Sequence, residues 1–155
     1  MYNKVLVPLD GSELAECALE HVIRMFKDGS IREITILNVV EADVQWAGMD
    51  GGGLDIFKIR DVLIEGSGKY LAGVAARLGA AGIQARTEVL EGGRPAGTIC
   101  EYARKSGTDL IAMATHGYSG LKKLMFGSVA YALLHEAHIP VLMIRPGSGE
   151  GLQAG

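Results

Sequence analysis

Short apolar runs alternate with longer stretches of helical periodicity along this 155-residue chain. The runs are rich in aliphatic side chains and lie at residues 4–9, 33–40, 83–90, 109–114 and 140–145. Such alternation is typical of a parallel sheet, because each connection between parallel neighbours carries a helix. The crossovers are right-handed, so few topologies remain. The pattern therefore predicts an α/β fold: a single doubly wound sheet of five parallel strands with helices on both faces.

The polarity of the runs predicts the strand order. Residues 4–9 and 109–114 are the most apolar and should be central, whereas 83–90 alternates polar residues as an edge strand does. These expectations correspond to the order 3-2-1-4-5. Ligands bind such sheets beyond the carboxyl ends of the strands, where the winding direction reverses. Here that point lies between the ends of the first and fourth runs.

Capping signals indicate where the helices begin. Ser12 is a typical N-cap residue before the apolar repeat at 14–26, and Pro95 suits the first position of a helix. The segment 56–78 predicts one long helix, although its glycines have low helix propensity. A fourth helix is expected after Ser128.

Length and charge narrow the class of protein. The length suits one domain, placed at residues 1–146, and a glycine-rich tail at 147–155 is expected to be disordered. A net charge of −3 with mixed signs argues against a nucleic-acid or membrane surface built on bulk charge. Neither a signal peptide nor a membrane-length apolar run is evident, and Cys17 and Cys100 form no metal or redox motif. We therefore expect a soluble cytoplasmic protein with reduced thiols.

Three glycines crowd the segment between the fourth run and the last helix: Gly117, Gly120 and Gly127, the last directly before Ser128. A helix that begins there presents free N–H groups and the positive end of its dipole, which together favour phosphate. Lys122 and Lys123 would add positive charge. The alternative is a tight turn in which Ser128 serves only as a helix cap.

The same segment resembles the nucleotide-binding signature of the universal stress protein family. That signature is Gly-x-x-Gly, nine residues, then Gly followed by Ser or Thr, and this chain has "ATHG", "YSGLKKLMF" and "GS", with Ala114 at the first glycine. The stretches "KVLVPLDGS", "EGGRPAGTI" and "IPVLMIRP" are also similar to the family, so the resemblance covers residues 2–146. It implies the adenine nucleotide alpha hydrolase-like fold.

The resemblance implies roles for individual residues. Asp10 would accept hydrogen bonds from ribose or the adenine edge, and Pro8 and Val39 would form apolar walls beside adenine. The loop after the fourth strand and the first amides of the last helix would hold ribose and phosphates. The binding residues implied are Pro8, Asp10, Val39, Ala114, Thr115, His116, Gly117, Tyr118, Ser119, Gly120, Gly127, Ser128, Val129 and Ala130.

Plainer interpretations of some of these residues remain open. Asp10 can be an ordinary turn aspartate bonded to the backbone of the "GSE" that follows it. Pro8 and Val39 can be core residues. His116 can act as an acid, base or phosphoacceptor, or simply donate a hydrogen bond, and no carboxylate near it in sequence orients it for catalysis.

The resulting hypothesis is an ATP-binding stress-response or signalling module. ATP would carry Mg²⁺ or Mn²⁺ on its phosphates, and the resemblance implies a homodimer through residues 140–145, an apolar edge that invites pairing. An unidentified protein partner would receive the signal. The sequence shows neither a paired-carboxylate metal site nor an arginine set at the phosphates, so at most slow hydrolysis or self-phosphorylation, known in relatives, is expected.

Other functions are weighed against this one. A nucleotide-free dimeric interaction protein of the same fold is the main alternative, and Ala114 in the signature keeps it open. An adenylyl transferase or pyrophosphatase would carry a histidine pair or an "SGGxDS" motif early in the chain, and "PLDGSE" has neither. A phospho-receiver domain needs clustered acids after the first strand, where Asp10 has no adjacent acid.

Overall fold

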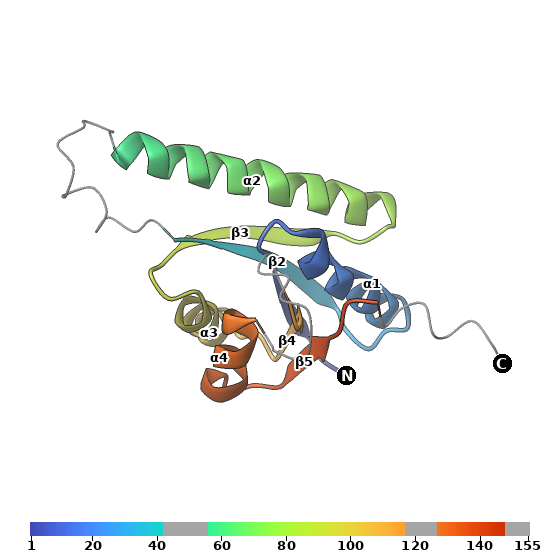
Figure 1. Cartoon of the computed structure of the whole chain (residues 1–155). Coiled ribbons are helices and arrows are strands. Elements are labelled where there is room, and N and C mark those ends of the chain that lie inside the picture. The colour runs from blue at the N-terminus through green and yellow to red at the C-terminus, as the bar shows by residue number, and fades with distance from the viewer. Residues whose placement is uncertain (42–55, 117–126, 148–155) are drawn as a thin grey trace.

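Five parallel strands form one sheet in the order β3-β2-β1-β4-β5, as predicted (Figure 1). The computed structural model describes residues 1–41, 56–116 and 127–147, so residues 148–155 of the predicted tail lie outside the described part. The elements are β1 (Lys4–Pro8), α1 (Glu13–Lys27), β2 (Glu33–Val40), α2 (Ile56–Ala80), β3 (Ala85–Glu91), α3 (Pro95–Ser106), β4 (Leu110–Ala114), α4 (Ser128–Glu136) and β5 (Val141–Ile144).

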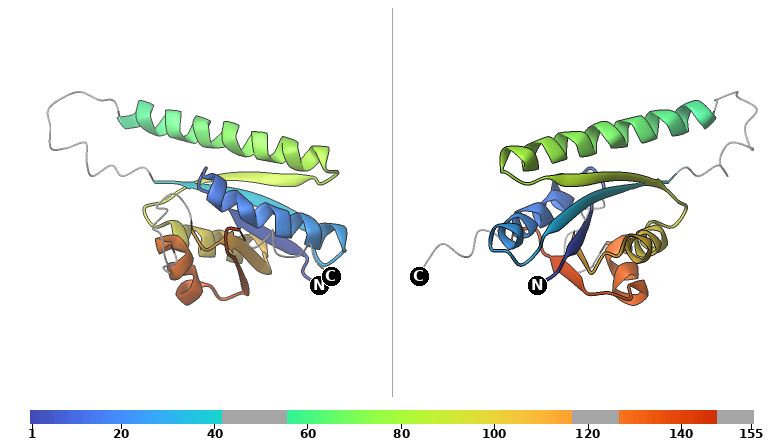
Figure 2. Two further views of the ribbon diagram at one scale, coloured as in Figure 1. Left: turned by 45° about the vertical axis from the view of Figure 1, so that its right-hand side comes forward. Right: turned by 180° about the vertical axis from the view of Figure 1, so that it is seen from behind.

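Helices cover both faces of the sheet, and the sheet separates the hydrophobic core into two clusters. Residues of α1 and α2 pack with Val5 and Val7 of β1, while residues of α3 and α4 pack with Leu6 between them in sequence. This follows from the alternation of side chains along a strand. Both figures show α3 and α4 lying side by side, and α2 running along β2 and β3 (Figure 2).

Burial explains the strand order. All five residues of β4 are buried, and β1 is buried from Val5 to Pro8, so these strands occupy the centre with neighbours on both edges. β3 exposes Arg86 and Thr87 and lies at one edge. The prediction of central and edge strands from polarity is therefore confirmed.

Helix α2 continues without a break through its glycines. Gly66, Gly68 and Gly73 each cost about 0.5–1 kcal/mol relative to alanine. The C-terminal half offsets this cost because Leu71 and Val74 are almost wholly buried against the sheet. Among the described residues, no helix has both the length and the apolar character that a bilayer crossing requires.

Some element ends differ from the predicted ones by one or two residues. β1 ends at Pro8 rather than at Leu9, although the Leu9 N–H still donates to the Leu37 carbonyl at 2.8 Å. β3 begins at Ala85 rather than at residue 83, because Ile83 donates its N–H to the Leu78 carbonyl and so completes the end of α2. The start of β3 is thus decided by a local bond to the end of α2, whereas Leu9 is bonded to a residue far from it in sequence.

Candidate functional site

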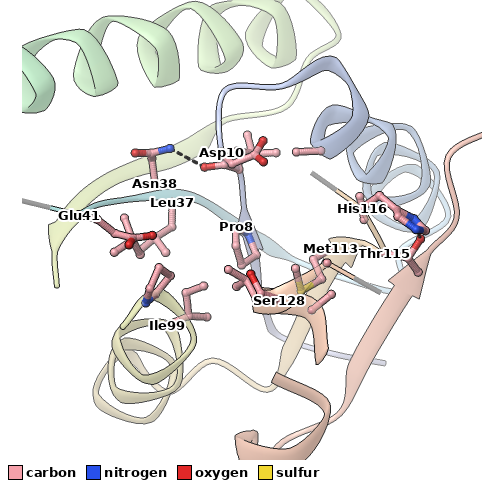
Figure 3. A pocket seen from close by; sticks show the side chains of 18 residues that line it. Pro8, Asp10, Leu37, Asn38, Glu41, Ile99, Met113, Thr115, His116 and Ser128 are labelled. Atoms are coloured by element: carbon pink, nitrogen blue, oxygen red, sulfur yellow. Dashed lines mark hydrogen bonds between the residues drawn. The ribbon is translucent and has the colours of Figure 1, made fainter. Parts of the chain in front are cut away.

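A cavity of about 330 Å³ opens at the carboxyl ends of the central strands (Figure 3). The ends of β1, β2 and β4 and the first residues of α3 and α4 line it. This is where the winding direction of the sheet reverses, between β1 and β4. The volume lies within the usual range of small-molecule pockets.

The residues expected to bind nucleotide come from three separate segments, and the structure brings the described ones together around this cavity. The lining includes Pro8, Asp10, Val39, Ala114, Thr115, His116, Gly127, Ser128, Val129 and Ala130. The other four, Gly117, Tyr118, Ser119 and Gly120, lie outside the described residues, as do Lys122 and Lys123.

Apolar residues from the side of the sheet that α3 and α4 cover line part of the cavity, here called the apolar slot, and the sequence interpretation named only some of them. Pro8 and Val39 were expected, but Leu37, Ile99 and Met113 also line the slot. The periodicities of β2 and α3 could have identified two of these residues from the sequence. Leu37 precedes Val39 by two positions in β2 and so shares its face, and Ile99 follows Pro95, another lining residue, by four positions on α3.

Asp10 forms the turn that leads from β1 into α1. Its Oδ1 accepts hydrogen bonds from the Ser12 N–H at 2.9 Å and from the Ser12 hydroxyl at 2.6 Å. The Ser12 hydroxyl oxygen in turn accepts from the Ala15 N–H at 3.1 Å and caps α1, as predicted. Between them Gly11 has φ of 86°, a conformation that favours glycine. The turn interpretation of Asp10 is thus confirmed, and the same residue lines the cavity.

The chain after β4 is tied to the start of α4. The Gly127 N–H donates to the Thr115 carbonyl at 2.8 Å, and the Thr115 N–H donates to the Ile144 carbonyl at 2.8 Å. Thr115 is only 7 % exposed, and its Oγ1 lies 2.9 Å from His116 Nδ1. These bonds join the two ends of the signature segment, Thr115 and Gly127, and tie them to the end of β5.

The first turn of α4 lines the cavity. Gly127 is the N-cap residue, with φ −57° and ψ 156°, and no side-chain hydrogen bond caps the helix within the described residues. Ser128 is the first helical residue, which contradicts the alternative in which Ser128 serves only as a helix cap. The early N–H groups of an α-helix have no partner inside it, and those of Ser128, Val129 and Ala130 lie in cavity-lining residues. With the helix dipole, such groups favour an anion.

Ala114 occupies the first glycine position of the signature without strain. It is the last residue of β4, pairs with Ile144 of β5 and is 4 % exposed. Extended backbone suits alanine as well as glycine, because only positive φ angles penalise the methyl group. The departure from the signature therefore leaves the backbone path of the cavity intact.

Two further polar residues line the cavity on β2 and just after it. Asn38 donates from Nδ2 to the Leu9 carbonyl at 2.6 Å and accepts at Oδ1 from the Ser67 hydroxyl at 2.8 Å. Glu41 is exposed at the rim. Among the described residues, no group of three or more His, Cys, Asp or Glu side chains could hold a metal ion.

Comparison with known proteins places this fold in a family. The model of the "Universal stress protein family" matches residues 1–145. A curated relative, universal stress protein MJ0531 of Methanocaldococcus jannaschii, is 34% identical over 145 residues, which cover 94% of this chain and 83% of the relative. The family match spans every strand and helix described above.

Solved structures agree with the match. That of MJ0577, whose curated counterpart is a universal stress protein of Methanocaldococcus jannaschii, has a TM-score of 0.78 at 28% identity and covers 94% of this chain and 96% of its own. A universal stress protein family protein from Arabidopsis thaliana, solved with AMP bound, has a TM-score of 0.66 at 16% identity and covers 96% and 94%, so it shows the shared fold. On the family match, this chain belongs to the universal stress protein family.

Proposed function

We propose that this protein is an ATP-binding signalling module of the universal stress protein family. One observation carries the proposal: within a single cavity, an apolar slot lies beside a helix N-terminus that no side chain of the described residues caps. A nucleotide has two parts that correspond to these features: a flat base, whose ring faces suit an apolar slot, and an anionic phosphate chain, which suits a helix N-terminus. The site thus matches the chemistry of both.

In this proposal the base lies in the slot. Pro8 and Val39 flank it, with Ile99 and Met113 as further apolar contacts from α3 and β4. Burying a base there removes apolar surface from water on both ring faces, which stabilises the complex at about 25 cal/mol per Å². Asp10, at the rim, would accept hydrogen bonds from the ribose.

The phosphates would lie at the start of α4. The N–H groups of Ser128, Val129 and Ala130 would donate to phosphate oxygens, and Thr115 and His116 would contact ribose and phosphates from the end of β4. Gly117, Tyr118, Ser119 and Gly120 of the signature are proposed contacts as well. Mg²⁺ or Mn²⁺ would arrive with the phosphates.

The fold family supports an adenine nucleotide. The Arabidopsis neighbour holds AMP, and its fold matches this chain over nearly the whole length. The distinction between ATP, ADP and AMP depends on how many phosphates the first turn of α4 can hold. We propose ATP because its three phosphates bring more negative charge than those of ADP or AMP to the three successive cavity-lining residues that offer donors there.

The proposed role is to bind nucleotide and signal its presence to a protein partner in the cytoplasm. No arginine lines the cavity among the described residues, so fast hydrolysis is not part of the proposal. A homodimer would form through residues 140–145, because β5 is an edge strand of the sheet in the described part of the chain.

Isothermal titration calorimetry with ATP and Mg²⁺ tests the proposal. We expect saturable binding by the unmodified protein. The affinity of Gly127→Val for ATP should be lower by roughly tenfold or more, because its branched side chain fills space at the proposed phosphates. The φ and ψ of Gly127 are open to valine, so the variant should fold. Ser128→Glu should weaken binding similarly, because its carboxylate repels phosphate.

Gly79→Val is the matched control. Gly79 lies near the C-terminal end of α2, outside the lining of the cavity, and an added Cβ there meets nothing within 4 Å. It should bind like the unmodified protein. Absence of ATP binding by the unmodified protein would contradict the proposal and favour the alternative, a nucleotide-free dimeric interaction protein.

A further inference from the structure

The chain that leaves β1 is held to β2 through both backbone groups of one residue, Leu9. Its N–H donates to the Leu37 carbonyl at 2.8 Å. Its carbonyl accepts from Asn38 Nδ2 at 2.6 Å, the bond drawn as a dashed line at Asn38 in Figure 3. Leu9 is 3 % exposed, so its carbonyl needs a protein partner. That carbonyl shares a rigid peptide plane with the Asp10 nitrogen. The Asn38 side chain therefore orients the peptide that delivers Asp10 to the cavity.

A second hydrogen bond sets the orientation of the Asn38 amide. Its Oδ1 accepts from the Ser67 hydroxyl of α2 at 2.8 Å, while Nδ2 faces the Leu9 carbonyl. A flipped amide would put two acceptor oxygens face to face at Leu9, at a cost in free energy. Ser67 thus holds Asn38 as a donor toward Leu9, and both ends of the amide already have protein partners.

Asp10 is held from the other side as well. Its Oδ1 accepts from the N–H and the hydroxyl of Ser12 at 2.9 and 2.6 Å. The residue is therefore fixed through its preceding peptide by Asn38 and through its side chain by the start of α1. A carboxylate fixed in this way loses little conformational entropy when it binds a hydroxyl.

We propose that Asn38 is a positioning residue for ribose recognition, acting on the nucleotide through Leu9 and Asp10. The inference rests on the proposed function, because it assumes that a nucleotide occupies the cavity with its ribose at Asp10. A site arranged to bond a hydroxyl discriminates strongly against an analogue that lacks it. Asn38 should therefore control the preference for ribose over deoxyribose more than the affinity for the phosphates.

The test compares dissociation constants for ATP, 2′-deoxyATP and 3′-deoxyATP by calorimetry. The unmodified protein should prefer ATP to at least one deoxy analogue by about tenfold or more, as expected for a hydrogen bond to a charged group. Asn38→Asp keeps the shape of the side chain but faces the Leu9 carbonyl with an oxygen, and it should reduce that preference to roughly threefold or less.

Two more variants complete the design. Ser67→Ala removes only the bond that orients the amide and should reduce the preference by a smaller factor, which keeps the test decisive if Asn38→Asp does not fold. Gln84→Glu makes the same amide-to-carboxylate change at an exposed position just before β3, at the opposite end of the sheet. It should keep the full preference.

The outcomes separate the two proposals. No ATP binding by the unmodified protein overturns the proposed function and this inference with it. ATP binding without preference over either deoxy analogue, or a preference that Asn38→Asp and Ser67→Ala leave unchanged, overturns the inference alone. An equal loss of affinity for all three ligands in Asn38→Asp, with the preference kept, also overturns it, because that is the signature of a merely structural residue.

Discussion

Gly127 and Ser128 would act in the cavity mainly through backbone atoms. Sequence spacing places the helix start near Ser128 and leaves open whether Ser128 caps the helix, whereas the cap residue in the structure is Gly127. A capping serine and a first-turn serine differ only in backbone angles, which the sequence does not encode locally. Gly127 has φ of −57°, so its glycine is not required by conformation. Its value lies in the absence of a side chain beside the proposed phosphates.

The two cysteines allow a prediction at the same scale. Burial raises the pKa of both thiols, and the carboxylates of Glu20 and Glu136 add to the rise at Cys17 and Cys100 respectively. The thiolate is the reactive form, so both should react with iodoacetamide more slowly in the folded protein than in urea at pH 8. Mass spectrometry of the alkylated protein checks the rates, and equal rates would contradict the account.

The same pKa shifts predict how stability depends on pH. Since the pKa of each thiol is higher in the folded protein than in the unfolded chain, the free energy of unfolding should fall as pH rises above about 9.

Strands and helices were largely predictable because polarity differs along the chain. The apolar β4 and the polar β3 could be placed at the centre and the edge from composition alone. The part of the cavity lining that α3 contributes could not be predicted from composition. Ile99 reaches the slot because α3 packs on the same face of the sheet as Leu37, and that contact depends on the whole fold. Asn38 was likewise inaccessible to prediction, since its partners Leu9 and Ser67 are far apart in sequence.

The glycines of α2 test the view that packing holds this helix. An added Cβ at Gly66 meets nothing within 4 Å, so Gly66→Ala should raise the free energy of unfolding by about 0.5–1 kcal/mol. Gly82, after the helix, has φ of +80°, and Gly82→Ala should instead lower it by about 1 kcal/mol. Urea denaturation measures both. A lower stability for Gly66→Ala would contradict this view of α2.

At the scale of the whole molecule, β5 is an edge strand of the sheet that the described residues form. The Pro140 carbonyl accepts from Ile111 of β4 and the Ile144 carbonyl accepts from Thr115, just after β4, so by alternation the backbone groups of Val141 and Met143 face outward. The proposed dimer would pair through these outward groups. Light scattering at micromolar concentration should give twice the mass of one chain. Met143→Pro removes one outward donor without removing a bond to β4, and it should shift the protein toward monomer. A monomer mass for the unmodified protein would contradict the proposed dimer.

The most direct test of the central claim is an amide NMR titration of the ¹⁵N-labelled protein with ATP and Mg²⁺. The account predicts saturable shifts that are largest at Ser128, Val129 and Ala130 and are accompanied by shifts at Asp10 and Val39. Those residues come from α4, from the turn after β1 and from β2, so a common saturation curve would place one ligand against all of them. Shifts confined to other surfaces, such as the groove between α1 and α2, or no shifts at millimolar ATP, would contradict it.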